Sequence, residues 1–141
     1  MYKPVCIAFA FTLTLFLLSN ASAGSNGDAP QEGQDWIITQ DTHVWDDEVN
    51  VKDIIVTIGK TLKLENVSLN SVGSIQIQGE TEWLNSTIYH DKRDLEDNIS
   101  LYSKLEIINT ELLMNATDSY DGNNANVFYI SKEAELTIRD Y

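Results

Sequence analysis

The stretch 62–69 decides the fold of this chain, and it reads Leu62-Lys63-Leu64-Glu65-Asn66-Val67-Ser68-Leu69. Apolar and polar residues alternate as far as Glu65, the alternation steps by one residue after Asn66, and it resumes at Val67. A chain that turns a corner and keeps its apolar side chains on the inside needs this step, because side chains along a strand alternate between two faces. The stretch therefore indicates two strands joined at a corner.

The same pattern recurs along the chain, with corner residues at Asn66, Asn85, Asn109 and Asp140. The corners are 19, 24 and 31 residues apart, and self-similarity at such intervals is typical of solenoids. The longer intervals contain the polar insertions 90–97 and 116–124, which a solenoid tolerates at a fixed corner. The pattern predicts an all-β fold, a right-handed parallel β-helix of about four coils that is open at the C-terminus.

A β-sandwich is the alternative fold. The chain after residue 36 consists of short runs of β-branched and other apolar residues, such as Ile54-x-Val56-x-Ile58, separated by one or two polar residues. Such runs fit any all-β fold, and an immunoglobulin-like sandwich would need about seven strands with turn signals every 8–12 residues. The repeated step at the corner residues favours the solenoid.

The corner asparagines have two explanations. Asn tolerates the left-handed backbone region and bonds neighbouring backbone groups, so it favours turns in any context. In a stack of coils, successive Asn amides can also bond one another in a ladder. Asp140 lacks the amide donor, so a ladder would end or weaken there.

The N-terminus has the pattern of an export signal. Lys3 precedes an apolar run over 5–18, and Ala21-Ser22-Ala23 is typical of a cleavage site. We expect a signal peptide over 1–23, a flexible linker over 24–35 and one β-helix domain over 36–141. The apolar run is shorter than the roughly 20 residues that span a bilayer, so an uncleaved membrane anchor is the less favoured alternative.

The charge balance limits the classes of partner. The chain has 22 acidic and 9 basic residues and a formal net charge of −13. Nucleic acids and anionic lipid surfaces bind clustered basic residues, so we expect no nucleic-acid partner and no membrane contact other than through an uncleaved signal segment. Cys6, the one cysteine, lies in the signal segment, so the exported chain has no disulfide to stabilise it.

Three segments carry a resemblance to a known group: 59–69, 103–112 and 132–140. With them, the chain from residue 36 to residue 141 resembles the right-handed parallel β-helix (pectin-lyase-like) repeat proteins of prokaryotic, especially archaeal, cell surfaces. The resemblance implies the fold and an exported location far more than any activity. Those relatives are usually longer, so we expect either a truncated reading frame or end-on association at an uncapped C-terminal coil.

The sequence contains no convincing catalytic, cofactor or metal site. Asp46-Asp47 is the one adjacent Asp pair that resembles the galacturonase-like hydrolases, but their Gly-His-Gly and Arg-Ile-Lys patterns are missing, and a solvated turn explains the pair better. The Asp and Asn residues of 118–124 lack the spacing of a calcium loop. We therefore predict no catalytic residue, no cofactor and no metal.

Four Asn-x-Ser/Thr sequons follow the signal segment, at Asn66, Asn85, Asn98 and Asn115. The first two are corner residues and could not carry glycan if they pointed inward. We therefore expect Asn98 and Asn115, which flank the insertions, to be the candidate glycosylation sites.

These observations predict an exported cell-surface or extracellular scaffold whose two insertions project along one side. Carbohydrate or other surface proteins are the expected partners. The alternatives are the N-terminal part of a carbohydrate-active lyase or hydrolase, and a β-sandwich binding module.

Overall fold

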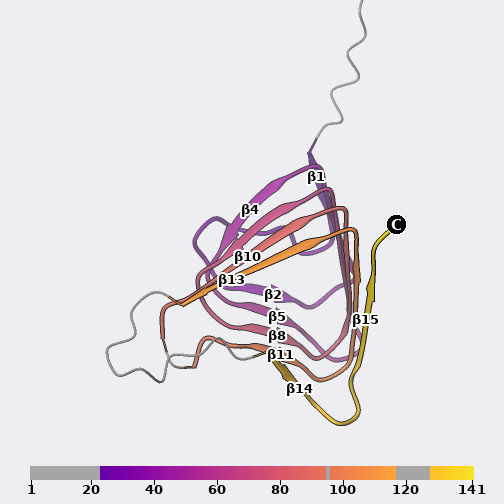
Figure 1. The fold of residues 1–141 in the computed structure, drawn as a ribbon. Helices are drawn as coiled ribbons and strands as arrows, with labels where there is room; N and C mark the ends of the chain where they lie inside the picture. Colours follow the sequence, from indigo (N-terminus) through magenta and orange to yellow (C-terminus); the bar gives the residue numbers. More distant parts are fainter. Residues whose placement is uncertain (1–22, 95, 117–127) are drawn as a thin grey trace, which may run out of the picture.

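The computed structural model describes residues 23–94, 96–116 and 128–141. These residues contain strands and no helix, and the strands wind into a parallel β-solenoid of about four turns with a triangular outline (Figure 1). Each turn passes through three sheets, which we name A, B and C. This confirms the predicted parallel β-helix.

The sheets are built from the same position of successive turns. Sheet A contains β1 (Gly24–Asn26), β3 (Thr42–Trp45), β6 (Thr61–Glu65), β9 (Glu80–Leu84), β12 (Lys104–Ile108) and β15 (Glu135–Arg139). Sheet B contains β2 (Trp36–Ile38), β5 (Ile54–Val56), β8 (Ile75–Ile77), β11 (Ile99–Leu101) and β14 (Phe128–Ile130). Sheet C contains β4 (Glu48–Val51), β7 (Ser68–Ser71), β10 (Thr87–Lys92) and β13 (Glu111–Ala116).

Strand pairing excludes the β-sandwich alternative. Strands adjacent in the sequence lie in different sheets, and every pair apart from β1 and β3 is parallel. A sandwich would place sequence neighbours side by side as antiparallel hairpins. The register matches the repeat: Leu64 lies beside Trp83, Trp83 beside Ile107, and Ile107 beside Ile138.

The core consists of columns of inward side chains that run along the solenoid. In sheet B one column contains Ile38, Val56, Ile77 and Leu101, all fully buried. The column continues to Ile130, which is 45% exposed because no further coil covers it within the described residues. Burial at this end of the column therefore depends on a further coil.

The corner between sheets A and C contains the repeated Asn. Asn66, Asn85 and Asn109 have positive φ of 55°, 48° and 45°, and Asp46 occupies the same corner in the first turn with φ of 52°. Asn and Asp are the residues with a side chain that most readily adopt this backbone region. Asp140 stands in the same column, after the Ile108–Arg139 pair, but it is not among the residues with positive φ.

The Asn side chains form a broken ladder on the outside of this corner. Asn109 Nδ2 donates to Asn85 Oδ1 at 3.2 Å, and Asn66 Nδ2 donates to Asp46 Oδ1 at 3.0 Å. Within residues 23–94 of the structure, no side-chain hydrogen bond joins Asn66 to Asn85. The Asn side chains are exposed, so water can replace these bonds and each contributes little.

A row of hydroxyl groups completes the same corner on the inside. Ser86 Oγ accepts the N–H of Val67 at 3.0 Å, and Thr110 Oγ1 accepts the N–H of Ser86 at 3.1 Å. These hydroxyls satisfy turn N–H groups that lie near the core, where an unpaired donor costs about 1–3 kcal/mol. The sequence signal for this row is a Ser or Thr directly after the corner Asn.

Residues 24–35, predicted as a flexible linker, instead cover one edge of the solenoid. β1 pairs antiparallel with β3, and Trp36 Nε1 donates to the backbone oxygen of Asp28 at 2.6 Å. The Asp28 carboxylate accepts the N–H groups of Thr39 and Gln40, and these bonds, that of Thr39 foremost, lower the pKa of the carboxyl group. The composition of the segment concealed this role, because a strand edge is covered through backbone groups and needs no apolar side chain.

The connections at the corner between sheets B and A differ in length. Residues 57–60 form a projecting turn, closed by the N–H of Lys60 on the oxygen of Thr57 at 3.1 Å, whereas the next turn of the solenoid has only Gln78 and Gly79. A Cβ on Gly79 would lie 2.1 Å from the Lys60 oxygen and 2.5 Å from the Thr57 oxygen. Only glycine fits beneath this turn.

Replacing Gly79 with alanine tests this close contact. Gly79→Ala should lower the free energy of unfolding by about 2 kcal/mol or more, because two backbone oxygens must move. Gly59→Ala is the matched control: Gly59 has φ of 73° and open space around it, so only backbone strain of about 1 kcal/mol applies. Urea unfolding of both variants gives the comparison, and equal losses would contradict the contact.

A second pair of variants tests the Asn ladder. Asn109→Asp removes the donor to Asn85, whereas Asn85→Asp keeps the acceptor, and both tolerate the positive φ. Measured in high salt to screen the added charge, Asn109→Asp should lose about 0.5–1 kcal/mol more unfolding free energy than Asn85→Asp. A bond without energetic value would leave the two variants equally stable.

Candidate functional site

The corner between sheets C and B is where the predicted insertions belong. The first insertion, expected over 90–97, joins β10 to β11, and the second, expected over 116–124, falls in the connection from β13 to β14. His90, Asp91 and Lys92 belong to β10, so the first loop begins at Arg93. Ala116 ends β13, and residues 117–127 lie outside the described part of the chain. We name this edge the loop corner.

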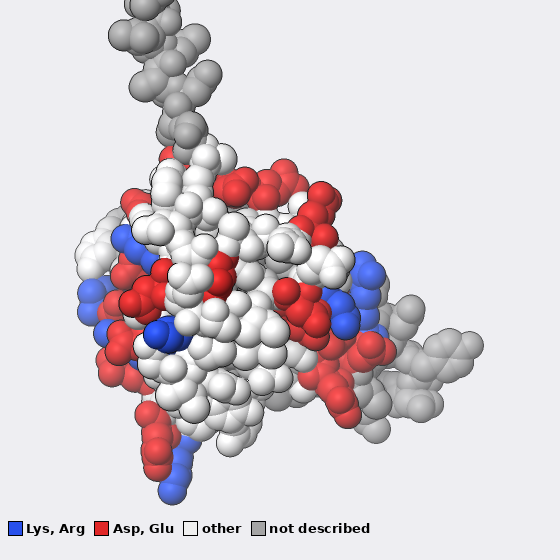
Figure 2. Space-filling view, turned by 180° about the vertical axis from the view of Figure 1, so that it is seen from behind, with Lys and Arg blue, Asp and Glu red and all other residues white. Residues whose placement is uncertain are grey.

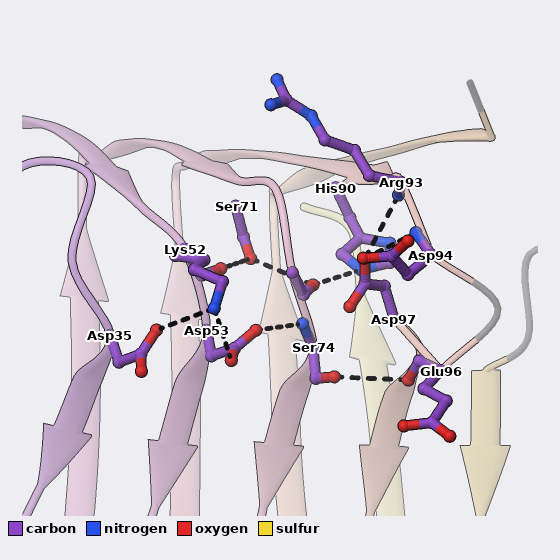
Figure 3. Close-up of polar contacts among 11 residues, drawn as sticks. Asp35, Lys52, Asp53, Ser71, Ser74, His90, Arg93, Asp94, Glu96 and Asp97 are labelled. Carbon is purple, nitrogen blue, oxygen red and sulfur yellow. Dashed lines mark hydrogen bonds and ion pairs between the residues drawn. The ribbon is translucent and has the colours of Figure 1, made fainter. Parts of the chain in front are cut away.

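Polar contacts connect successive turns along the loop corner (Figure 3). Lys52 Nζ lies 3.8 Å from Asp35 Oδ1 and 3.9 Å from Asp53 Oδ2. Asp53 Oδ1 accepts the N–H of Ser74 at 2.8 Å, and Ser74 Oγ donates to the backbone oxygen of Glu96 at 3.3 Å. The contacts therefore run from the first turn of the solenoid to the loop that follows β10.

The loop after β10 is held by its own side chains. Asp97 Oδ2 accepts the N–H of Asp94 at 2.8 Å and that of Arg93 at 3.3 Å. The side chain of Asn98 bonds the backbone oxygen of Glu96. Carboxylate and amide groups of this kind replace the missing strand pairing in a turn.

His90 and Lys92 point into the solenoid beneath this loop. His90 is fully buried and Lys92 is 3% exposed, because alternation from Ile88 places both on the inner face of β10. In its column His90 lies between Ser71 and Met114. The sequence analysis placed His90 in a loop and missed this inward position, although the alternation Ile88, His90, Lys92 was the available signal.

The buried imidazole of His90 is only half satisfied. Nε2 donates to the Gly73 oxygen at 2.9 Å, whereas Nδ1 is buried without a hydrogen-bond partner in the described structure. Burial lowers the pKa of His90, while the bond to Gly73 and the carboxylates of Asp97 and Asp91 act in the opposite direction. The neutral imidazole is therefore the form that suits this position.

Both candidate glycosylation sites lie at the loop corner: Asn98 directly precedes β11, and Asn115 is the next-to-last residue of β13. Both amides have hydrogen-bond partners. Asn98 is half-buried, and its Oδ1 accepts from Lys92 Nζ at 3.0 Å. Asn115 is exposed, and its Nδ2 lies 3.3 Å from both Tyr89 Oη and Asp91 Oδ1. Asn66 and Asn85, set aside in case they pointed inward, are exposed. Glycosylation of Asn98 and Asn115 stays a prediction.

The outer face of sheet A carries a second cluster, in which charged side chains pair with one another. Glu65 contacts His43 at 3.1 Å and Lys63 at 3.5 Å, and Lys63 reaches Glu82 at 3.2 Å. Glu106 contacts Lys104 at 3.9 Å and Arg139 at 3.8 Å. The hydrogen bond to Glu82 is the largest cause that raises the pKa of Lys63. Lys63 is thus held protonated, which makes it a poor general base.

Among residues 23–94, 96–116 and 128–141, no group of three or more His, Cys, Asp or Glu side chains is arranged to hold a metal ion. The same residues include no helix with the length and hydropathy to cross a membrane. Asp46-Asp47 lies at the corner between sheets A and C, as a turn before Val49.

Comparison with protein-family models, with curated proteins and with solved structures finds no match for this chain.

Acidification tests the burial of His90. Well above pH 6.5 the residue is neutral in both states and contributes no pH dependence. Because burial lowers the pKa of His90 in the folded protein, the unfolded chain binds a proton first as the pH falls, so stability falls between about pH 6.5 and the lowered folded pKa and this loss is complete below it. Each pH unit in this window should remove at most about 1.4 kcal/mol.

His90→Gln should flatten the decline between pH 6.5 and the range where carboxylates titrate, since the amide can still donate to Gly73. His43→Gln is the matched control, because His43 is half-exposed on sheet A, and it should keep the decline. Urea unfolding across this pH range is the measurement. If the decline survives in His90→Gln and disappears in His43→Gln, the loss of stability at low pH comes from His43, and the prediction for His90 is wrong.

Proposed function

We propose that this protein is an exported cell-surface or extracellular scaffold, and that it acts by holding loops and strand edges in fixed positions. The observation that carries the proposal is the continuous stack of turns, in which polar contacts at one edge connect residues from Asp35 to Glu96. A stack of this kind is stiff along its length, and loops on one corner keep a fixed spacing.

The surface charge supports an extracellular role. Figure 2 shows the face opposite to that of Figure 1, with acidic side chains outnumbering basic ones around an uncharged centre. A strong net negative charge keeps a protein soluble and repels anionic polymers. We therefore propose carbohydrate or other surface proteins as partners, with no nucleic acid and with membrane contact only through an uncleaved signal segment.

The last described turn supports end-on association. β13, β14 and β15 are the edge strands of the three sheets, and edge strands with free backbone groups readily pair with another layer of strands. Ile130 and Ile138 of this turn are 45% and 68% exposed at inward positions. The opposite edge of sheet A is covered by the antiparallel β1, so the two ends differ.

A finer identity accompanies this proposal. The parallel solenoid agrees with the pectin-lyase-like β-helix proteins of archaeal and other prokaryotic cell surfaces, which also implies a right-handed winding. The described turns carry the corner residues of that resemblance at Asn66, Asn85 and Asn109.

The enzyme alternative finds less support. A lyase or hydrolase of polysaccharides would need unpaired acid and base groups on one face. The carboxylates Glu65, Glu82 and Glu106 of sheet A instead share ion pairs with basic side chains. This arrangement suits a structural surface.

Export is tested by fusing alkaline phosphatase, which is active only outside the reducing cytoplasm, to the C-terminus of the chain. The fusion with residues 1–141 should be active, and the fusion with residues 24–141 should be inactive. The exported product should begin at Gly24. Equal activity of both fusions would contradict export, and a membrane-bound product that keeps Met1 would show an anchor.

The scaffold role is tested against catalysis with the purified protein and a panel of acidic and neutral polysaccharides. We expect no release of reducing or unsaturated ends. The scaffold proposal would be wrong if the protein released such ends and if Glu82→Gln or Glu106→Gln abolished the release while His43→Gln left it unchanged. That result would show that the protein is an enzyme.

A further inference from the structure

The corner between sheets B and A contains a groove, which we name the corner groove. Its floor is formed by two short corners, residues 78–79 and 102–103, which contribute to the lining of a hollow together with Ile58. Two longer turns, residues 57–60 and 131–134, flank the short corners along the solenoid, and we call them its walls. The two turns have the same closure: Lys60 N–H bonds the Thr57 oxygen, and Ala134 N–H bonds the Ser131 oxygen, both at 3.1 Å. We propose that the corner groove binds an uncharged polysaccharide chain.

The spacing of the walls follows from the solenoid. The two projecting turns are three strand steps apart, which gives about 14 Å between their backbones, since neighbouring strands lie about 4.8 Å apart. The space between the walls therefore accepts one extended chain. In Figure 1 the turn between β14 and β15, drawn in yellow, projects beyond the corner of the neighbouring turns.

The floor is rigid and its backbone is already paired. The N–H groups of Gln78 and Gly79 both bond the oxygen of Val56, at 2.9 and 3.0 Å. Tyr102 N–H bonds the Ile77 oxygen at 2.8 Å, and the Ser103 oxygen accepts the N–H of Glu135 at 2.8 Å. Such a floor needs no ordering on binding. It also gives an extended peptide few backbone partners, and strand addition depends on them.

The lining combines exposed apolar surface with uncharged polar groups. A hollow of about 470 Å³ is lined by Ile58, Gln78, Tyr102 and Ser103. Ile58 is 80% exposed and Tyr102 is 47% exposed. Tyr129, 50% exposed, lies against Tyr102 with ring centroids 5.9 Å apart. Exposed apolar groups gathered in a hollow with a few polar groups are typical of a binding site.

The chemistry of the lining selects the class of ligand. None of the four residues that line the hollow is charged, and the charged residues of the two walls, Lys60, Lys132 and Glu133, are not part of that lining. Tyrosine rings pack on the apolar C–H faces of sugar rings, and the Gln78 amide and the Ser103 and Tyr hydroxyls can each donate and accept with sugar hydroxyls. An anionic polymer would meet the net negative charge of the protein. The site thus deepens the proposed function by assigning its carbohydrate partner a neutral chemistry and a place.

Binding is tested on the purified chain by calorimetry with cellohexaose, maltohexaose and mannohexaose, and with hexagalacturonate as the anionic probe of equal length. At least one neutral hexasaccharide should bind, and hexagalacturonate should bind at least tenfold more weakly. This assay does not depend on export, so its failure leaves the scaffold proposal standing, and failure of the export test leaves the groove standing.

Two substitutions locate the binding. Tyr102→Ala should weaken the affinity for the neutral probe roughly tenfold or more, and Ile58→Asp, at a side chain too exposed to matter for the core, should do the same. Tyr141→Ala is the matched control, because Tyr141 is 86% exposed outside the groove, and it should bind as the parent chain does. Circular dichroism and unfolding midpoints verify that each variant is folded.

Three outcomes would overturn the proposal. The first is that no neutral hexasaccharide binds up to its solubility limit. The second is that hexagalacturonate, or a pool of extended peptides in the same assay, binds as tightly as the best neutral probe. The third is that Tyr102→Ala and Ile58→Asp bind as Tyr141→Ala does.

Discussion

Contact between successive turns is the interaction on which this structure depends. Each inward side chain of an inner turn is buried by the equivalent side chains of the turns on either side, and each inner strand completes its hydrogen bonds with the same neighbours. The effect is visible where a neighbour is missing: Leu101 is fully buried, while Ile130, next in the same column, is 45% exposed. The short strands of one turn could not form a core by themselves, so stability must come from the stack.

At the corners of the stack, the backbone must turn and its polar groups need partners outside the strand pairing. At the corner between sheets A and C, an Asn or Asp takes the left-handed backbone region, and after Asn85 and Asn109 the hydroxyl of the next residue accepts a turn N–H. At the loop corner, the Asp53 carboxylate accepts the backbone N–H of Ser74. At the corner between sheets B and A, Gly79 permits two turns to touch directly. Each corner therefore has its own chemistry, and the groove exists because the connections at the third corner differ in length.

The fold could be predicted from the sequence because the alternation of apolar residues is local, and because stacked turns repeat it at regular intervals. The one-residue step in the alternation after Asn66, Asn85 and Asn109 indicates which side chains of two consecutive strands point inward. The recurrence of this step indicates that the turns are stacked. The same reasoning was weaker at the site. It placed His90 in a loop, whereas continued alternation from Ile88 places it in the core, and it gave Gly24–Asn26 no structure, because strand pairing through backbone atoms leaves no trace in composition.

The sequence alone determined the parallel solenoid, the register of its turns, the Asn corners and the negative charge, since each depends on residues close together in the chain or on a simple count. Tertiary structure alone decided which residues from different turns meet. Ile58, Gln78 and Tyr102 are separated by about a turn each in sequence and line one hollow, and Tyr102 and Tyr129 touch across the insertion between them. The physical reason is that a solenoid brings together residues one coil apart, and the coil length varies with every insertion, so only the folded stack fixes which side chains share a surface.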